Sequence, residues 1–495
     1  MQKAKTYSVS FKGGIVSPGF LADILAVAAT AGVKQLRLGL RQQLLIDIKQ
    51  SYQAAFEKTC LTRGIMIEER HLASPGIMSA YPVIHFNQED SWLREGVYKD
   101  VFDQFETPIR FKVNIVEFNQ SFVPLYTGHI NWITTEKPHY WRLALRLPNS
   151  GAVFYWPEWI YTNNIASVSR AIEEVLMDPA LITGGDCVFF KKLLRRKLDS
   201  ISYIYVPEEN MEHTARFYLP YYEGFNKMDN SYWLGIYRRD EYFDLAFLRE
   251  ICELCQQSKI AEMYTTPWKS LIIKDIDPGS RPRWDRILGK YRVNVRHAAN
   301  ELNWQIEDQS EEGLSIKRAV IRHFDKEDVR TYGLCFGVQI KSHSTLFASV
   351  LIKKKVVRNP HRLKSLDRYD ILHTADFNPN TQHWVLFRED VKKEFIGIYL
   401  VSLCKEFYSR TGEDQPVQSG NNTSKETEDV KAQKEVYQCN VCLSAYDPEQ
   451  GDAAVGIPPG TDWEQLPSNY CCSVCGAEKP AFNPVHLGVL QYIDG

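Results

Sequence analysis

Long apolar runs are missing from this sequence. Hydrophobic residues make up 44% of the 495 residues, yet no stretch approaches the roughly eighteen consecutive apolar residues that mark a membrane helix. The opening residues MQKAKTYSVSFKGG also lack an apolar segment directly behind their lysines. We therefore expect neither a signal peptide nor membrane insertion.

Nucleotide-binding motifs are missing as well. The chain has no Walker motif and no G-x-G-x-x-G, so no local nucleotide site is predicted. Two short basic runs, at 191–197 and 353–358, are typical of solvated surface, and we expect no nucleic-acid partner. The same runs could instead steer an acidic redox partner.

Cysteine is too scarce and too uneven for a disulfide framework. The chain has eleven cysteines, an odd number for a secreted scaffold of this length. Four of them have the spacing of a metal site. This usage favours a reducing compartment, and we expect a cytoplasmic protein.

Charge is distributed unevenly along the chain. Residues 435–482 contain seven acidic side chains and one basic one, whereas residues 1–410 carry a formal net charge of +7. The segment 411–434 is polar, has no aromatic residue and reads as a flexible linker. We expect an acidic C-terminal domain that docks transiently on the basic body near Lys353, Lys354, Lys355 and Arg358, or serves an outside partner.

An internal repeat organises the body. Residues 20–46 and 247–273 align without a gap, and each copy passes from helical to strand-like spacing of its apolar residues. An extended segment precedes each helix, so each copy reads as a strand–helix–strand unit of an α+β layer. In the first copy, strand alternation would place Arg37 and Arg41 on one face.

Two C-x-x-C pairs lie near the C-terminus, in YQCNVC at 437–442 and in CSVCG at 472–476. Cys439, Cys442, Cys472 and Cys475 could together hold one metal ion in a tetrahedral four-sulfur site. That ligand set suits iron or zinc, and spacing alone favours a zinc ribbon.

The residues between the two pairs favour iron. YDPEQGDAAVGIPPGTDWEQLP at 446–467 resembles the rubredoxin family, and the resemblance covers roughly 48 residues and extends to Phe482. It implies one iron ion per chain, Fe(Cys)4, above a small aromatic core of Tyr437, Tyr446, Trp463, Tyr470 and Phe482. Leu443 and Ser444 stand where the family usually has a glycine and an aromatic, and Cys471 is an extra thiol read as a bystander.

The repeated unit resembles the ferredoxin-like half-domains of sirohaem nitrite and sulfite reductases. RLGLRQQLLI at 37–46 and YTTPWKSLII at 264–273 carry this resemblance. It implies that Arg37 and Arg41 face an anion, either sirohaem carboxylates or the substrate. A solvated strand face is the alternative interpretation of this pair.

The cysteines that hold the cofactors of that family are absent. Its C-x5-C and C-x3-C spacings do not occur among the remaining thiols, so we expect neither sirohaem nor a 4Fe-4S cluster. Cys252 and Cys255 lie three residues apart on an expected helix and are read as buried structural thiols.

The predicted fold class is α+β: duplicated ferredoxin-like half-domains of sulfite and nitrite reductase type, plus a small C-terminal domain of rubredoxin-like metal knuckles. The expected boundaries are 1–80 for copy one, 81–230 for an α+β region, 231–300 for copy two, 301–410 for a second α+β region, 411–434 for the linker and 435–484 for the rubredoxin domain.

Three functions remain open at this stage. The first is a single-electron transfer protein serving assimilatory nitrite, nitrate or sulfite reduction, with a reductase donor and a nitrite/nitrate or sulfite reductase acceptor as redox partners. The second is a reductase that binds sirohaem without the usual cysteines. The third is a zinc-binding interaction module.

Overall fold

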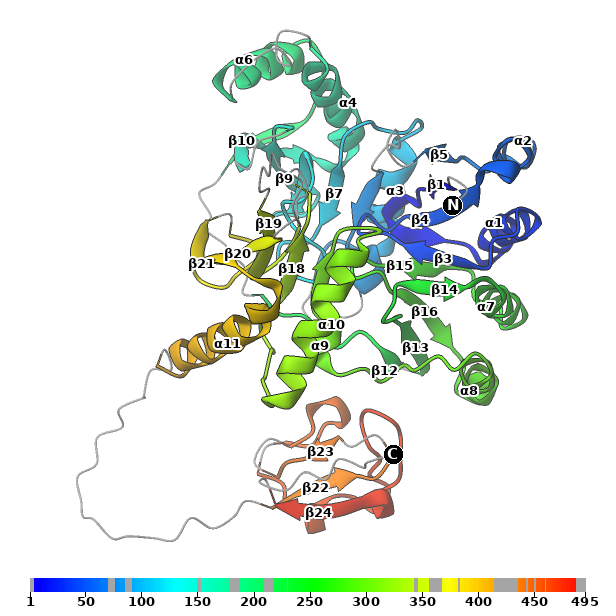
Figure 1. The fold of residues 1–495 in the computed structure, drawn as a ribbon, viewed down its shortest axis with the longest axis vertical. Coiled ribbons are helices and arrows are strands. Elements are labelled where there is room, and N and C mark those ends of the chain that lie inside the picture. Colours follow the sequence, from blue (N-terminus) through cyan, green and yellow to red (C-terminus); the bar gives the residue numbers. More distant parts are fainter. Residues whose placement is uncertain are drawn as a thin grey trace.

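The computed structural model describes a large body and a small C-terminal domain (Figure 1). Among its described helices, none is long and apolar enough to cross a membrane. The expected linker lies outside the described residues, except that helix α11 extends through its first three positions, 411–413. The described residues are 4–69, 76–84, 91–148, 153–178, 187–208, 217–228, 230–341, 346–355, 367–381, 383–413, 435–441, 444–448, 451–458 and 460–486.

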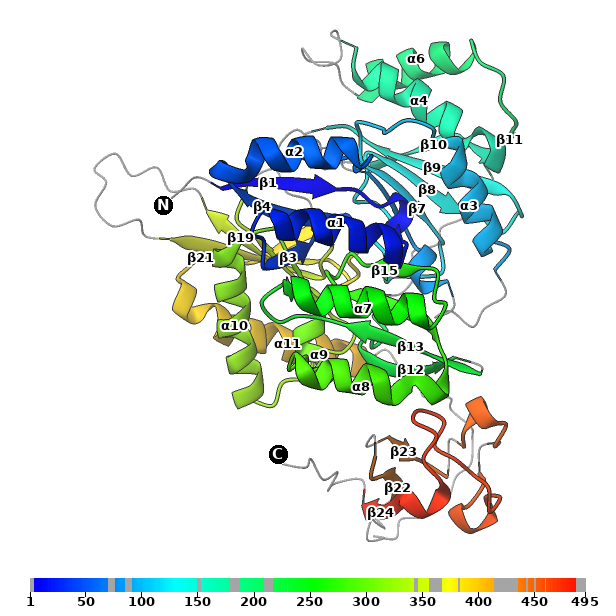
Figure 2. The same cartoon turned by 90° about the vertical axis from the view of Figure 1, so that its right-hand side faces the viewer.

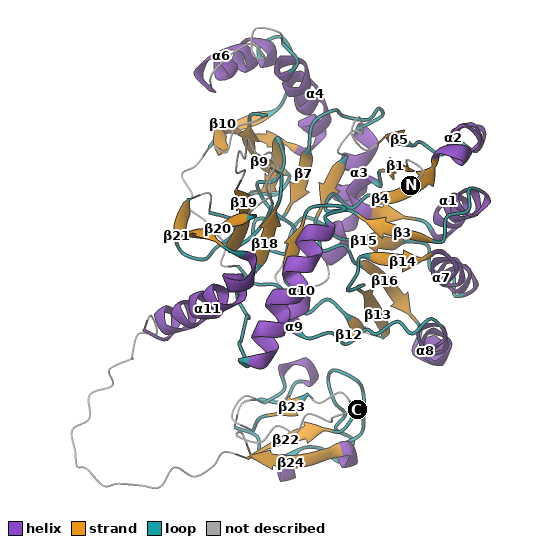
Figure 3. Ribbon diagram, in the orientation of Figure 1, coloured by secondary structure: helices purple, strands orange, loops and turns teal. Residues whose placement is uncertain are grey.

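The first ferredoxin-like half contains a five-stranded sheet with helices on one face (Figure 3). Helix α1 begins at Pro18, directly after Ser17, whose hydroxyl accepts a hydrogen bond from the Phe20 amide and caps the helix. The elements of this half are β1 (Ala4–Val9), β2 (Ile15–Val16), α1 (Pro18–Thr30), β3 (Gln35–Leu38), β4 (Leu44–Lys49), α2 (Gln53–Thr62) and β5 (Glu68–Glu69).

The second half repeats this order. Asp244 caps helix α7 at the position equivalent to Ser17, accepting hydrogen bonds from the amides of Ala246 and Phe247. A single-residue bulge at Asp275, with φ of +58°, is the point after which the copies differ in length by one residue. The elements are β12 (Gly224–Met228), β13 (Ser231–Ile236), β14 (Tyr242–Asp244), α7 (Leu245–Gln257), β15 (Met263–Thr265), β16 (Leu271–Ile276) and α8 (Arg281–Lys290).

The two halves exchange one short strand each. Strand β2 of the first half pairs with β15, and β14 of the second half pairs with β3. Apolar residues of both halves, Leu25 and Ile251 among them, therefore share one core. Helices α1, α2, α7 and α8 lie in a row on its outer side (Figure 2).

The repeat also continues into the two regions that the sequence left as mixed α+β. In each region, the first three strands pair in parallel with one another. The third strand is then followed by antiparallel strands and by a helix. The first region has β6 (Ile77–Ser79), α3 (Glu95–Gln104), β7 (Val113–Val116), β8 (Ile130–Thr134), β9 (Tyr140–Arg146), β10 (Val153–Tyr161), α4 (Ile165–Leu176), α6 (Cys187–Leu198) and β11 (Tyr205–Pro207). The second has α9 (Ala299–Leu302), β17 (Trp304–Ile306), α10 (Glu311–Lys326), β18 (Phe336–Gln339), β19 (Val350–Lys355), β20 (Arg368–Thr374), β21 (Trp384–Val391) and α11 (Ile396–Glu413).

The C-terminal domain is a three-stranded antiparallel sheet with the order β23–β22–β24. Its strands are β22 (Glu435–Cys439), β23 (Ala445–Tyr446) and β24 (Phe482–His486). The five predicted aromatic residues form its core, as expected: the Tyr437 and Trp463 rings stack at 4.3 Å, and Trp463 lies 5.1 Å from Phe482.

Two residues with a left-handed backbone conformation contact several elements at the centre of the body. Gln42, with φ of +62°, bonds through its amide group to Ser79 and to the Thr265 carbonyl. Its equivalent in the second half is Lys269, with φ of +55°, whose Nζ lies 2.7 Å from Glu241 and 3.5 Å from Asp308. Both turns thus bring polar side chains into the interior and join separate parts of the chain.

Replacing Lys269 with methionine tests how much this buried ion pair stabilises the fold. The change leaves the Glu241 and Asp308 carboxylates without their cation in a buried site, so we expect the free energy of unfolding to fall by about 3–5 kcal/mol. Urea denaturation followed by fluorescence measures it. The control Lys58→Met, on the exposed side of α2, should change the value by less than about 0.5 kcal/mol. A loss below about 1 kcal/mol for Lys269→Met would show that the pair is not important for stability.

Candidate metal centre and basic cluster

Three of the four predicted metal ligands come together in the C-terminal domain. The ligand atoms of Cys439, Cys472 and Cys475 all lie within 4.8 Å of one another, and the Cys439 and Cys475 sulfurs are 3.7 Å apart. Among the described residues, this is the one group of His, Cys, Asp or Glu side chains with such geometry. Cys442 lies outside the described residues, so its place as the fourth ligand stays a prediction.

Two similar turns position these thiols. The Cys439 amide donates to the Ser444 carbonyl and the Cys472 amide to the Ala477 carbonyl, both at 2.8 Å. Gly476 closes the second turn with φ of +75°, a conformation that favours glycine. Its counterpart by spacing is Leu443, which also lies outside the described residues. Cys439 of the first turn and Cys472 and Cys475 of the second thus come together.

The surroundings of the thiols suit a metal that prefers sulfur. Cys439 and Cys472 are buried and Cys475 is half-buried. The Ser444 hydroxyl lies 3.0 Å from the Cys472 sulfur, so it can donate a hydrogen bond to a thiolate there. Cys471 is not part of the group, because its thiol donates to the Asn469 carbonyl. A set of soft sulfur donors fits iron or zinc.

The two arginines predicted to bind an anion lie in different surroundings. Strand β3 ends at Leu38, so the alternation that would place them on one face does not reach Arg41. Arg37 pairs with Asp47 and lies over the Tyr242 ring. Arg41 instead donates to Asn114 at 2.5 Å and to the Val113 carbonyl at 2.7 Å.

Arg41 is one member of a basic cluster that sequence reasoning missed. We define the basic cluster as Arg41, Lys112, His129 and Arg146. The last three lie where β7 and β8 begin and β9 ends, and backbone hydrogen bonds link them in that order. No sequence signal singled them out, because they come from three strands and are brought together only by the sheet.

Burial and mutual repulsion lower the pKa values of the basic cluster. Burial is the main cause for each group. It lowers the pKa of Lys112 to about 8, with the Arg41 and Arg146 charges adding to the effect. It lowers the pKa of His129 to about 3, so this ring is neutral at ordinary pH. Neighbouring cations that lower one another's pKa in a partly buried site would be stabilised by a bound anion.

The second half of the body lacks this charge at the equivalent positions. The Ser349 amide bonds to the Cys335 carbonyl at 2.8 Å, as His129 bonds to Lys112, and Thr374 bonds to Ser349 as Arg146 bonds to His129. Cys335, Ser349 and Thr374 therefore stand at the positions of Lys112, His129 and Arg146. Trp268 stands at the position of Arg41 in the repeat and is buried.

Five of the six thiols of the body are buried, and the sixth, Cys187, is partly exposed. Burial raises the pKa of Cys60 to about 11 and those of Cys252, Cys335 and Cys404 to about 12. Such thiols stay protonated near neutral pH and are poor metal ligands. The interpretation of Cys252 and Cys255 as buried structural thiols on a helix is confirmed.

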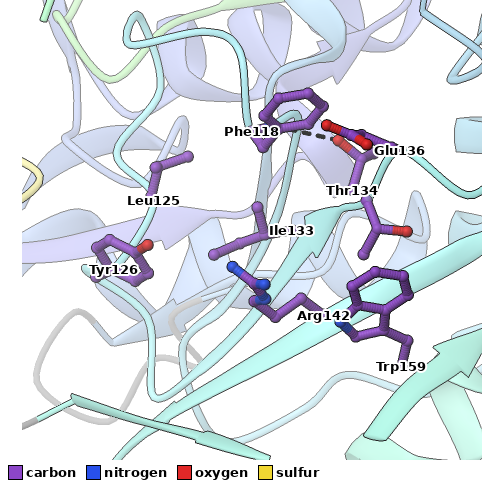
Figure 4. Close-up of a pocket in the computed structure, with 9 residues that line it drawn as sticks. Phe118, Leu125, Tyr126, Ile133, Thr134, Glu136, Arg142 and Trp159 are labelled. Carbon is purple, nitrogen blue, oxygen red and sulfur yellow. Dashed lines mark hydrogen bonds between the residues drawn. The ribbon is translucent and has the colours of Figure 1, made fainter. Parts of the chain in front are cut away.

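A small pocket lies at the other end of the same strands. Figure 4 shows Ile133 near its centre, Arg142 below Ile133, and Trp159 at the lower right next to Arg142. The Arg142 guanidinium pairs with Glu208 at 2.9 Å, so the chain itself supplies an anion for this arginine. We assign no ligand to the pocket.

Comparison with known proteins supports the predicted family of the C-terminal domain. The rubredoxin family matches residues 436–482. The probable rubredoxin of Methanothermobacter thermautotrophicus is 46% identical over 57 residues, which cover 12% of this chain and 89% of that protein. The high molecular weight rubredoxin of Moorella thermoacetica is 49% identical over 49 residues, 10% of this chain but only 21% of that protein.

The body is similar to a solved structure. The NirA protein of Mycobacterium tuberculosis superposes with a TM-score of 0.61 over 85% of this chain and 82% of its own, at 12% sequence identity. A likeness at this identity concerns the fold, and it confirms the predicted type of scaffold. The rubredoxin match implies electron transfer and suggests an iron site at the clustered cysteines. Through its C-terminal domain the chain belongs to the rubredoxin family, and this domain is joined to a body with the NirA fold.

Proposed function

We propose that the chain is a rubredoxin-type single-electron carrier that serves assimilatory nitrite, nitrate or sulfite reduction. The convergence of Cys439, Cys472 and Cys475 within a rubredoxin domain carries this proposal. In it, Cys442 is the fourth ligand and one iron ion is held per chain. The fold likeness of the body supports the pathway, since a reductase-like body suits contact with oxyanion-reducing partners.

An iron–tetrathiolate centre supplies transfer of one electron at a time. A reduced donor loses one electron to the site and an acceptor later gains it, with no proton or group transferred. The domain contributes the four sulfurs, the aromatic core that packs beneath them and the Ser444 hydroxyl at 3.0 Å from Cys472. In this proposal the body binds neither sirohaem nor a 4Fe-4S cluster, and the protein acts in the cytoplasm.

The neighbouring thiols Cys471 and Cys472 allow a matched test of the metal site. We expect one iron per chain after iron-replete expression, and substantial loss of iron in Cys472→Ser, because a sulfur ligand is removed. Cys471→Ser should keep its iron, since that thiol contacts the Asn469 carbonyl instead. Metal analysis and visible absorption measure both variants. Zinc alone in the wild-type protein, or equal loss in the two variants, would contradict the proposed site.

Ser444 offers a test of the redox role. Its hydroxyl stabilises negative charge on Cys472, and the reduced site carries one more negative charge than the oxidised site. Ser444→Ala should therefore lower the reduction potential. Each tenfold fall in the equilibrium constant for one-electron reduction of the site corresponds to about 59 mV. Spectroelectrochemistry measures the shift, with the exposed Ser468→Ala as control. An unchanged or higher potential in Ser444→Ala would exclude this role.

The basic cluster favours a second candidate function, a reductase-like body that binds an anion or sirohaem without the usual cysteines. Its support is the concentration of Arg41, Lys112 and Arg146 in one half of the body only. The carboxylates of a tetrapyrrole and a small oxyanion such as nitrite or sulfite are both anions that such a site could hold.

Anion binding at the basic cluster should depend on pH. The pKa of Lys112 is lowered to about 8, so the amine is charged below this pH and loses its charge as pH rises above it. We expect the affinity for sulfite, measured by calorimetry on the full chain, to fall as pH rises from 7 through about 8 to 9. Lys112→Met should weaken binding at pH 7 and remove most of this dependence. If sulfite does not bind to the wild-type protein and the protein contains no sirohaem, the second function is excluded.

A further inference from the structure

The metal end of the C-terminal domain presents an apolar surface. Val441 and Val474 each lie inside a C-x-x-C pair, and their side chains are 50% and 43% exposed. Gly476, directly after the ligand Cys475, is also exposed. Acidic residues are abundant in the rest of this domain. An apolar patch within an acidic domain is typical of a surface that contacts another protein.

The body has a complementary surface at the edge of its second ferredoxin-like half. Phe225 on β12 and Tyr232 on β13 pack edge to face at 6.4 Å. The Arg281 guanidinium, at the start of α8, lies 5.0 Å from the first ring and 5.3 Å from the second. We call these three residues the aromatic–arginine face. Arg281 also lies 3.9 Å from Asp285 on the same helix, but α8 exposes Arg283 and Arg286 as well, so the surroundings of this face are basic.

The repeat provides an internal comparison for this face. Lys5 is the equivalent of Tyr232 in the first half, and Gln53 is the equivalent of Arg281. Lys5 pairs with Glu57 and Glu69, a polar arrangement typical of solvated surface. The aromatic–arginine face is thus specific to the second half and is not a requirement of the shared fold.

The structure places the metal end against this face. A methyl carbon built on Gly476 would lie 3.7 Å from the Tyr232 hydroxyl oxygen. Both views show the C-terminal domain next to β12 and α8 (Figures 1 and 2). Residues 414–434 can span at most about 70 Å, so the domain stays near the body at a high effective concentration.

The surface expected from sequence is less suitable. Lys354 pairs with Glu312 and Asp367, and Lys355 pairs with Glu389. Carboxylates of the same α+β region therefore largely neutralise these two cations. Arg358 lies outside the described residues. A run of basic residues in the sequence therefore gives little net charge there.

We propose that the aromatic–arginine face is the docking site for this chain's own rubredoxin domain, residues 435–486. Docking sets the half-buried ligand Cys475 against the body, while charge attraction between the acidic domain and α8 favours the contact. The purpose of the contact rests on the proposed electron transfer, because an electron could then pass between the metal site and whatever the body binds. The contact itself requires only the two surfaces.

Zero-length carbodiimide coupling of the full-length iron protein tests this contact. Lys227 lies opposite Tyr232 in the β12–β13 pair and is exposed. At low ionic strength we expect peptide mass spectrometry to find Lys227 coupled to an acidic residue of the rubredoxin domain, such as the exposed Glu478. The yield should fall as salt is added, because exposed charges are screened.

Two substitutions and a matched control make the test specific. Tyr232→Ala and Arg281→Glu should each lower the yield at Lys227 by about threefold, the size expected for exposed contacts. Lys58→Glu makes the same change of charge on α2, the helix equivalent to α8, and should leave the yield unchanged. A yield that neither substitution lowers, or coupling concentrated at Lys353, would overturn the proposed face. Visible absorption of the same samples reports the iron site separately, so failure of docking is distinguishable from failure of the electron-transfer proposal.

Discussion

The exchange of short strands between the two ferredoxin-like halves is the constraint on which the body depends. Because β2 completes the sheet of the second half and β14 that of the first, neither sheet is complete without the other. The turns that follow β3 and β15 then direct Gln42 and Lys269 into the interior, where Gln42 bonds to Ser79 on β6 and Lys269 lies 3.5 Å from Asp308, just after β17. Hydrogen bonds and ion pairs at the centre of the repeat thus join the two ferredoxin-like halves to the two α+β regions.

A duplicated body allows its two halves to differ where function requires it. The first half concentrates cations in the basic cluster, and the second has neutral side chains at the equivalent positions. At the outer edge it is the second half that carries the candidate surface, the aromatic–arginine face. The first half has lysine–glutamate pairs at the equivalent positions. The two candidate surfaces therefore lie on different halves of one scaffold.

Features formed by residues close together in the sequence could be predicted, whereas features formed by distant residues could not. The grouping of Cys439, Cys472 and Cys475 could be predicted because their C-x-x-C spacing is local and the surrounding motif is almost continuous in the chain. The first repeat was visible because helix and strand lengths match closely in both copies. Its continuation through β6–β10 and β17–β21 was not, since loops of different length separate strands of unrelated sequence. Arg37 and Arg41 do not share a strand face, because β3 ends at Leu38 and a left-handed Gln42 follows, whereas anion binding by these residues stays a prediction. The basic cluster depends on the pairing of distant strands, which no local pattern reveals.

A reductive titration of the full-length protein tests whether the chain is a one-electron iron carrier. Small additions of dithionite under anaerobic conditions, with visible spectra after each step, count the electrons that each chain accepts. We expect one electron per chain, taken up as the ferric absorption disappears, with no further spectral change afterwards. Uptake of no electrons would contradict an iron carrier, and uptake of several, with sirohaem bands, would assign the redox chemistry to the body instead.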